Sequence, residues 1–225
     1  MRPWKIAVLA ASVLVAGCDA DFSGDRSVAA SVDGFDSVRI VGDAGTIEVV
    51  GDAGRTTLNA SGTAYATSAA RLETIQFVVR PDGNVLVVEA RAAGANSHFD
   101  IAIAIPGTLA VIVETGAGEV VLRDVRSARV RLGAGNVTID GVGEDVRVES
   151  VGAGNVTIAD VGGRVDVSNI GAGNVDITTV GGGVDVRDIG VGNITVRDVG
   201  GDLSVGNRGV GNVTHSDVRG AVNVR

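Results

Sequence analysis

The chain has little of several residue types on which common folds and sites depend. Its 225 residues include one cysteine, one methionine, one tryptophan and three prolines, and only 3% are aromatic. A single cysteine excludes a disulfide framework and a zinc site built on thiolates. The few aromatic rings argue against the sugar-stacking platforms that carbohydrate-active enzymes commonly use. Lys5 is the only lysine, so arginine supplies every fixed positive side-chain charge after it.

Glycine and aliphatic residues are abundant instead. The chain contains 34 glycines, and 45% of its residues are hydrophobic. This hydrophobicity, combined with a modest net charge, excludes a disordered chain. The glycines lack the every-third spacing of collagen, and helical bundles seldom contain so many. The composition therefore predicts a repetitive β protein.

The first eighteen residues have the pattern of an export signal with a lipid-attachment site. A positively charged start over residues 1–5 precedes an apolar stretch over residues 6–15, and Val-Ala-Gly-Cys ends at Cys18. Ten apolar residues are too few to span a bilayer core of about 30 Å. The motif resembles the bacterial lipoprotein signal, which implies removal of residues 1–17 and acylation of Cys18. We expect the mature protein to be held at a membrane through lipidated Cys18.

This anchor predicts a cell-envelope protein that faces the periplasm or the cell surface. Asp19 resembles the inner-membrane retention signal of enteric bacteria, a rule that other bacteria do not share, so the choice of membrane stays open. Without residues 1–17 the chain has seventeen basic and twenty-seven acidic residues, a formal net charge of −10. Nucleic acid and anionic lipid headgroups are therefore disfavoured partners. Polar residues 18–30 predict a flexible lipidated tether, and residues 31–225 predict a single domain.

A repeat of nineteen residues predicts the architecture of that domain. The motif Gly-x-Gly-Asn begins at Gly133, Gly152, Gly171, Gly190 and Gly209. Each unit holds two segments of alternating apolar and polar residues, such as 137–139 and 146–148, which indicates strands with one buried face. An irregular copy begins at Gly116, seventeen residues before the first regular one.

Stacking of these units predicts an all-β, parallel β-solenoid with regular coils over about residues 116–225. Valine and isoleucine line the interior, threonines such as Thr138 and Thr157 face outward, and glycines form the corners. Residues before 116 predict an irregular N-terminal β cap. Its expected strands are 37–41, 46–50, 74–79, 85–90 and 100–105. Residues 59–73 are either a loop or one short helix.

Four segments carry a family resemblance. They read Gly-Thr-Ile-Glu-Val at 45–49, Pro-Asp-Gly-Asn-Val-Leu-Val at 81–87, Ile-Ala-Ile-Ala-Ile-Pro at 101–106 and Glu-Thr-Gly-Ala-Gly-Glu-Val at 114–120. This order resembles the toast-rack domain, an adhesin-head family, from about residue 30 to the end. The resemblance implies a single-chain, right-handed parallel β-solenoid of bacterial envelope proteins, often without an assigned activity. It supplies no catalytic residues to transfer.

Repeated polar residues raise the question of ligand sites. We interpret the asparagines of the five motifs as a hydrogen-bonded row that closes the corners, with a ligand-binding row as the alternative. Asp160, Asp198 and Asp217 repeat at one position, and Asp166 and Asp185 at another, as carboxylates do in calcium-binding β-helices. Other residue types interrupt both rows, so we interpret them as solvated faces. No unit has the pattern of a phosphate-binding loop.

Catalytic residues are not predicted. His98 and His215 are the only histidines, and neither has the neighbours of a nucleophile relay. His98 falls in an expected polar loop. His215 falls where the preceding coil has Val196, which predicts that the last coil opens to water. Cys18 is thus the only predicted site residue, and no metal or cofactor is expected.

These features predict a non-enzymatic, lipid-anchored envelope protein whose solenoid binds a protein or a glycan, as an adhesin does. A polysaccharide-active β-helix enzyme is the competing class, although it would need clustered acids and usually aromatic platforms. An envelope-stress sensor or scaffold stays open as well. The last coil, residues 213–225, also offers an open edge for end-to-end self-association, which its charged residues would limit.

Overall fold

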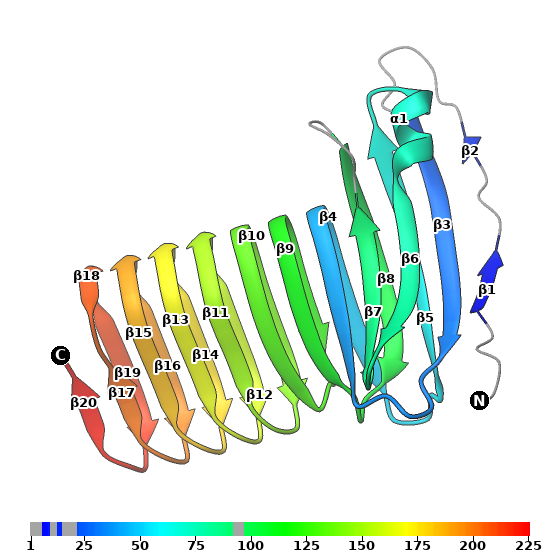
Figure 1. The fold of residues 1–225 in the computed structure, drawn as a ribbon. Helices are drawn as coiled ribbons and strands as arrows, with labels where there is room; N and C mark the ends of the chain where they lie inside the picture. The colour runs from blue at the N-terminus through cyan, green and yellow to red at the C-terminus, as the bar shows by residue number, and fades with distance from the viewer. Residues whose placement is uncertain (1–5, 10–12, 15–21, 92–96) are drawn as a thin grey trace.

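The computed structural model describes residues 6–9, 13–14, 22–91 and 97–225. Most of them lie in strands, and a long stack of strands leads from a broader N-terminal cap to the C-terminus (Figure 1). In the described part of the chain no helix combines the length and apolar character needed to cross a membrane.

An antiparallel sheet forms one side of the cap. β3 (Phe22–Ser31) pairs with β5 (Thr57–Ala66), and β5 pairs with β8 (Ser97–Pro106). Two short strands, β1 (Ile6–Leu9) and β2 (Val13–Leu14), pair antiparallel with β3 along its other edge. β3 is therefore an edge strand of the domain wherever residues 1–17 are removed.

A helix and a hairpin complete the cap. Helix α1 (Ala69–Thr74) begins after Ser68, whose hydroxyl accepts a hydrogen bond from the Arg71 amide and caps the helix. Leu72 of this helix is buried in the core. β6 (Gln76–Asp82) and β7 (Val85–Arg91) form an antiparallel hairpin whose turn has Gly83 at φ 62°.

β4 (Ser37–Asp52) connects the cap to the stack. On one edge its first half pairs with β7 and its second half with β8, and on the other edge it pairs with β9 (Ala110–Arg123), always in parallel. β9 pairs in turn with β10 (Ser127–Val142) at an interval of seventeen residues. This interval confirms the irregular copy predicted at Gly116. β4 is itself the first coil of the stack.

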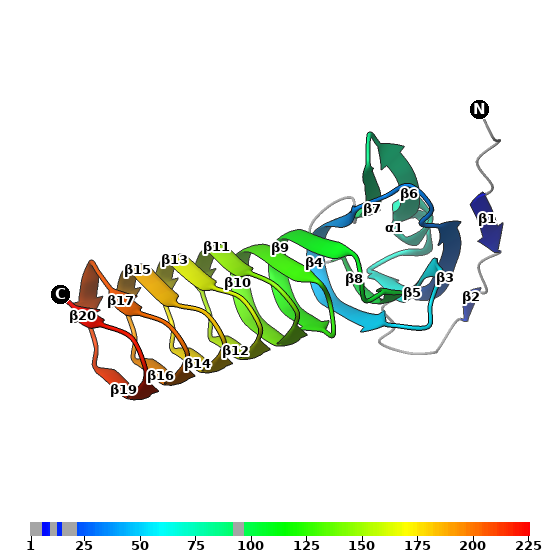
Figure 2. The ribbon, with the colours of Figure 1, turned by 90° about the horizontal axis from the view of Figure 1, so that it is seen from below.

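From β11 onward each coil contributes a strand to each of two faces (Figure 2). One face holds β11 (Val146–Ala153), β13 (Val165–Ala172), β15 (Val184–Val191), β17 (Leu203–Val205), β18 (Arg208–Val210) and β20 (Val222–Val224). The other holds β12 (Val156–Val161), β14 (Val175–Val180), β16 (Ile194–Val199) and β19 (Val213–Val218). Pairing is parallel, and partners such as Val156 and Val175 lie nineteen residues apart.

The core of the stack is a narrow layer of aliphatic side chains between the two faces. On β12, Val156 and Ile158 are buried while Thr157 between them is exposed. The same alternation recurs along β14 and β16. β-Branched residues suit both the strand backbone and this thin layer. The predicted inward rows of valine and isoleucine are confirmed.

The Gly-x-Gly-Asn corner brings successive coils into close contact. A Cβ built on Gly173, which has φ 150°, would lie 1.8 Å from the carbonyl oxygen of Gly154 in the coil before, so only glycine fits. Beside it the backbone N–H of Asn174 donates a hydrogen bond to the side-chain Oδ1 of Asn155, with the two atoms 3.0 Å apart. The same bond links the other asparagines of the row. The corner interpretation of both residue types is confirmed.

A second corner explains one of the two aspartate rows. Asp160, Asp198 and Asp217 have φ between 50° and 55°, and Gly141 occupies the same position with φ 69°. Aspartate and glycine adopt this left-handed conformation at the lowest cost, because the short polar side chain bonds locally or is absent. Thr179 fills the remaining position of the row with φ 54°. The row therefore meets a backbone requirement.

Two expectations for the N-terminal half need correction. The predicted tether over residues 18–30 is strand β3 from Phe22 onward, because Val28 and Ala30 point inward and the whole strand pairs with β5. Of the loop or short helix predicted over residues 59–73, the helix is present as α1 from Ala69 onward, but the residues up to Ala66 belong to strand β5. Small alanines supply the buried positions of β5, which weakens the apolar alternation that reveals a strand.

Two further expectations need correction. The two strands expected at 37–41 and 46–50 are one continuous strand, β4, in which Gly45 has φ 126°. His98 lies in β8 and not in a loop, and its ring stacks on that of Tyr65 with the centroids 4.4 Å apart. The strands expected at 85–90 and 100–105 are confirmed as parts of β7 and β8.

Candidate functional site

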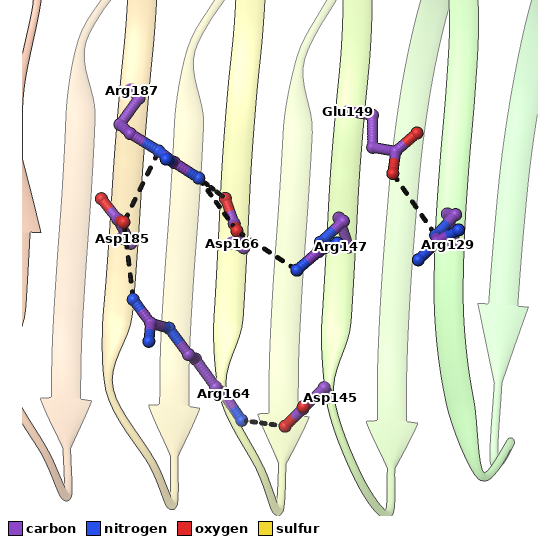
Figure 3. A network of polar contacts seen from close by, with 8 residues as sticks. All are labelled: Arg129, Asp145, Arg147, Glu149, Arg164, Asp166, Asp185 and Arg187. Carbon is purple, nitrogen blue, oxygen red and sulfur yellow. Dashed lines mark hydrogen bonds and ion pairs between the residues drawn. The ribbon is translucent and has the colours of Figure 1, made fainter.

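Charged side chains gather on the outer side of the face formed by β10, β11, β13 and β15. Arg129 and Arg147 each lie between two buried residues of a strand, so the alternation of the strand turns them outward. We call this surface the arginine face. It is defined by Arg129, Arg131, Arg147, Arg164 and Arg187 with the carboxylates of Asp145, Glu149, Asp166 and Asp185, all of which except Arg131 are drawn in Figure 3.

The centre of the arginine face is a carboxylate held between two guanidinium groups. Nη2 of Arg187 lies 2.7 Å from Oδ1 and 3.0 Å from Oδ2 of Asp166, and Nη2 of Arg147 lies 3.7 Å from Oδ2. Nε of Arg187 also lies 3.5 Å from Oδ2 of Asp185. The hydrogen bond to Asp166, together with the charges of Asp166 and Asp185, raises the pKa of Arg187 above its ordinary value. These contacts hold Arg187 in one place.

The two ends of the face repeat this arrangement. Glu149 bridges two arginines of the preceding coil, with Oε2 2.5 Å from Nε of Arg131 and Oε1 3.4 Å from Nε of Arg129. Arg164 lies at the opposite side, where its Nη2 is 3.4 Å from Oδ2 of Asp185. Its backbone N–H donates to Oδ1 of Asp145 at 2.8 Å, which fixes the corner from which the side chain starts.

The acidic and the arginine side chains of the arginine face differ in how much of each is exposed. The side chains of Glu149, Asp166 and Asp185 are only 17–19% exposed, whereas those of the five arginines are 48–60% exposed. These three carboxylates therefore lie beneath the guanidinium groups. Such a sheltered acid orients an arginine and leaves its remaining N–H groups directed to solvent. An acidic protein thus presents a guanidinium-rich surface along several coils.

A groove of about 630 Å³ runs over this surface. Besides four of the arginines, its walls carry Asp36, Asp145, Ser37 and Ser127. A second hollow of about 530 Å³ continues it past Arg131, Glu149 and Asn169. Volumes of this size accommodate a small molecule or a short length of a polymer. Guanidinium groups in such a groove bind carboxylate, sulfate or phosphate in bidentate fashion.

The outcome differs among the residues that the sequence analysis singled out. Cys18 lies outside the described residues, so its acylation stays a prediction. Asp166 and Asp185, interpreted from the sequence as a solvated row, are sheltered by arginines and belong to the arginine face. His98 and His215 lie in separate strands, β8 and β19. In the described part of the chain no group of three or more His, Cys, Asp or Glu side chains is arranged to hold a metal ion.

The sequence interpretation missed the arginines. Arg147 is one of the residues that interrupt the row formed by Asp166 and Asp185. The available signal is that the row contains both charge signs at equivalent positions, since Arg147, Asp166 and Asp185 are register partners in successive coils. Opposite charges in neighbouring coils of a solenoid are adjacent in space.

The comparisons with known proteins give matches among solved structures only. No family model matches the chain, and no curated protein matches its sequence. A candidate adhesin from Bacteroides fragilis is 17% identical, with a TM-score of 0.44 over 85% of this chain and 97% of that one. A candidate cell adhesion protein from Clostridium sporogenes is 11% identical, with a TM-score of 0.38 over 89% and 97%.

A third structure has a different description. It is a candidate lipid-binding protein from Parabacteroides distasonis, 12% identical, with a TM-score of 0.27 over 89% of this chain and 96% of that one. At these identities and TM-scores the likenesses carry no argument about what this chain does.

Proposed function

We propose that the protein is a non-enzymatic, lipid-anchored component of the bacterial cell envelope, and that its right-handed solenoid of nineteen-residue coils binds a protein or a glycan through the arginine face. The observation that carries the proposal is the set of exposed arginines held from below by sheltered carboxylates. A surface that served only to keep the protein in solution would not need guanidinium groups held in fixed orientations. The toast-rack resemblance of residues 45–120 supports an envelope role.

The geometry of the chain suits presentation from a membrane. β3 begins at Phe22, four residues after Cys18, so the cap would lie close to the lipid anchor. The strands of one face from β4 to β20 form eight layers, which corresponds to about 34 Å at a strand spacing of about 4.8 Å. The arginine face occupies the middle of this length. An anchored protein would hold it clear of the headgroups.

The test compares two faces of the same solenoid. Lipidated protein is reconstituted in liposomes and mixed with isolated envelope material from the same bacterium, and the bound fraction is measured by sedimentation. Arg147→Gln with Arg187→Gln should abolish binding. Arg123→Gln with Arg197→Gln removes the same charge from the opposite face, where these arginines pair with Glu48 and Asp176, and should leave binding unchanged.

Two results would overturn the proposal. Equal binding by both double variants would show that the arginine face is not the binding surface. Release of soluble sugar or peptide from the envelope material by the wild-type protein, absent in a buffer control, would show an enzyme.

A further inference from the structure

We propose that the ligand of the arginine face is an acidic polysaccharide, a linear glycan whose sugars carry carboxylate groups. This inference rests on the proposed function and specifies the chemistry of its ligand. Carboxylates of the glycan would pair with Arg129, Arg147, Arg164 and Arg187, which line one groove. Arginine suits this role because its planar fork matches a carboxylate with two parallel hydrogen bonds.

The mixture of charges in the groove favours a glycan over other polyanions. Asp36 and Asp145 lie on the same walls as the arginines, and both are hydrogen-bond acceptors. Asp36 accepts one bond from Nδ2 of Asn84 at 2.6 Å, and Asp145 accepts one from the Arg164 amide. A carboxylate has about four acceptor positions, so both can accept more. Sugar hydroxyls would donate to them, whereas a phosphate or an acidic side chain in the same place has no hydrogen to donate and would be repelled.

The remaining polar groups of the groove point the same way. Ser37 and Ser127 can each donate and accept a hydrogen bond, as the hydroxyls of a sugar require. A ligand with both carboxylates and hydroxyls therefore offers a partner to every type of polar group on the walls. The overall negative charge of the protein disfavours partners of high charge density, such as nucleic acid.

The repeat of the solenoid also matches a glycan. Arg129 and Arg147 are register partners in adjacent coils, and Arg187 reaches back to the coil of Asp166. Guanidinium groups therefore recur at about one coil spacing, about 4.8 Å. An extended pyranose chain advances by a similar length per sugar. An extended peptide repeats its same-face side chains at about 6.6 Å, which does not match.

The binding should depend strongly on salt and on ligand length. The groove over the arginine face is lined by charged side chains and by small polar or aliphatic ones. Ionic contacts therefore supply most of the affinity for the glycan. Such contacts between half-exposed groups weaken at high ionic strength. Longer chains engage more coils and bind more tightly through effective concentration.

The experiment uses full-length lipidated protein in detergent micelles, and polygalacturonate, dextran and polyglutamate of matched length as probes. Calorimetry should show binding of polygalacturonate, none of dextran, and loss of binding at roughly 1 M salt. Arg147→Gln with Arg187→Gln should weaken polygalacturonate binding about tenfold or more, because two charge-assisted pairs are lost. The matched pair Arg123→Gln with Arg197→Gln should not change it. Circular dichroism confirms that each variant keeps its β structure.

A third variant separates a glycan from an acidic protein. Asp36→Asn should weaken the binding of polygalacturonate and strengthen that of polyglutamate, since the amide no longer repels an acidic side chain. Polyglutamate bound as tightly as polygalacturonate by the wild type, or no binding of polygalacturonate at all, would overturn the inference. If the arginine-face variant still loses binding to envelope material, the proposed function stands and only the ligand chemistry is wrong.

Discussion

His215 of β19 is the register partner of Val196 of β16, yet Val196 is fully buried and His215 is exposed. Arg208 is likewise exposed, although its register partner Ile189 is buried. Val222 and Val224 of the last coil are exposed as well, at 43% and 38%. The interior row thus ends in polar groups at the open edge, as the sequence pattern predicted. Charges at such an edge limit pairing with another chain.

Replacing these charges should promote association between molecules. We expect Arg208→Ile with His215→Val to increase self-association of the soluble, unlipidated domain without altering its β content. The isoleucine and valine introduced are the residues that the preceding coil has at these positions, so the edge becomes a copy of a buried layer. Analytical ultracentrifugation over a concentration series measures the effect. An unchanged sedimentation profile at high concentration would show that the edge is already covered.

The anchoring prediction concerns Cys18. Replacement by alanine removes the sulfur to which lipid attaches, so Cys18→Ala should carry no acyl group and should keep residues 1–17. Metabolic labelling with an alkynyl fatty acid, combined with intact mass, measures both. Equal labelling of wild type and variant would refute lipidation at this residue.

Opposite faces of one strand should respond differently to the same substitution. Ile158 is fully buried in β12, whereas Thr157 beside it is exposed. A carboxylate buried without a partner costs several kcal/mol, so Ile158→Asp should unfold the stack or lower its stability by about 4 kcal/mol or more. Thr157→Asp should change stability by less than about 0.5 kcal/mol. Thermal unfolding of the two variants measures this difference. Similar unfolding midpoints would mean that the buried and exposed faces of β12 are misassigned.

Thr179 is a place where the chain can be stabilised. Its φ of 54° is costly for a β-branched residue, and the equivalent positions hold aspartate or glycine. We expect Thr179→Asn to raise stability by about 0.5–1 kcal/mol, since asparagine tolerates the left-handed region. Thr178→Asn, one residue earlier with an ordinary φ, is the control and should not stabilise. A lower melting temperature for Thr179→Asn would contradict the argument.

The pH dependence of stability should include a contribution from Glu89. The hydrogen bond from Arg80, aided by the charges of Arg80 and Arg91, holds the pKa of Glu89 below its ordinary value of 4.5. The folded state therefore gains stability above that value and loses it as the pH falls through the lowered pKa. Arg80→Gln should destabilise the protein at pH 7 by less than about 1 kcal/mol, because the pair is partly exposed.

Denaturant unfolding at neutral and acid pH measures this difference. The gap between wild type and Arg80→Gln should close in acid, and the NMR titration of Glu89 should move up in the variant. Arg219→Gln is a control that removes the same charge from the last coil. A gap that persists at all pH values would assign the effect of Arg80 to packing.

The regular coils could be predicted because every position of a solenoid must fit its copy in the next coil. Gly173 and Asn174 illustrate this, since each contacts its equivalent nineteen residues before. β4 could not be recognised as a coil in the same way. Its register partner β9 lies 73 residues later, as Ser37 and Ala110 show, and the cap strands are inserted between them. A fixed interval in the sequence does not reveal such a pair.

The arginine face was hidden for a related reason. Arg187 and Asp166 are twenty-one residues apart, so their contact runs diagonally between coils. A comparison of equivalent positions finds rows of one residue type but not diagonal pairs of opposite charge. The direction of a long side chain decides such pairs, and only the three-dimensional structure supplies it.

The uniform register of β11 to β19 makes the height of the molecule adjustable in whole steps. Each coil hydrogen-bonds only to the coil before it and the coil after it. Loss of residues 165–183 would join Arg164 to Val184 and bring Arg147 beside Asp185, which replaces Asp166 in its place. Gain or loss of one repeat in the gene would therefore lengthen or shorten the stack by about 4.8 Å without redesigning the corners or the core.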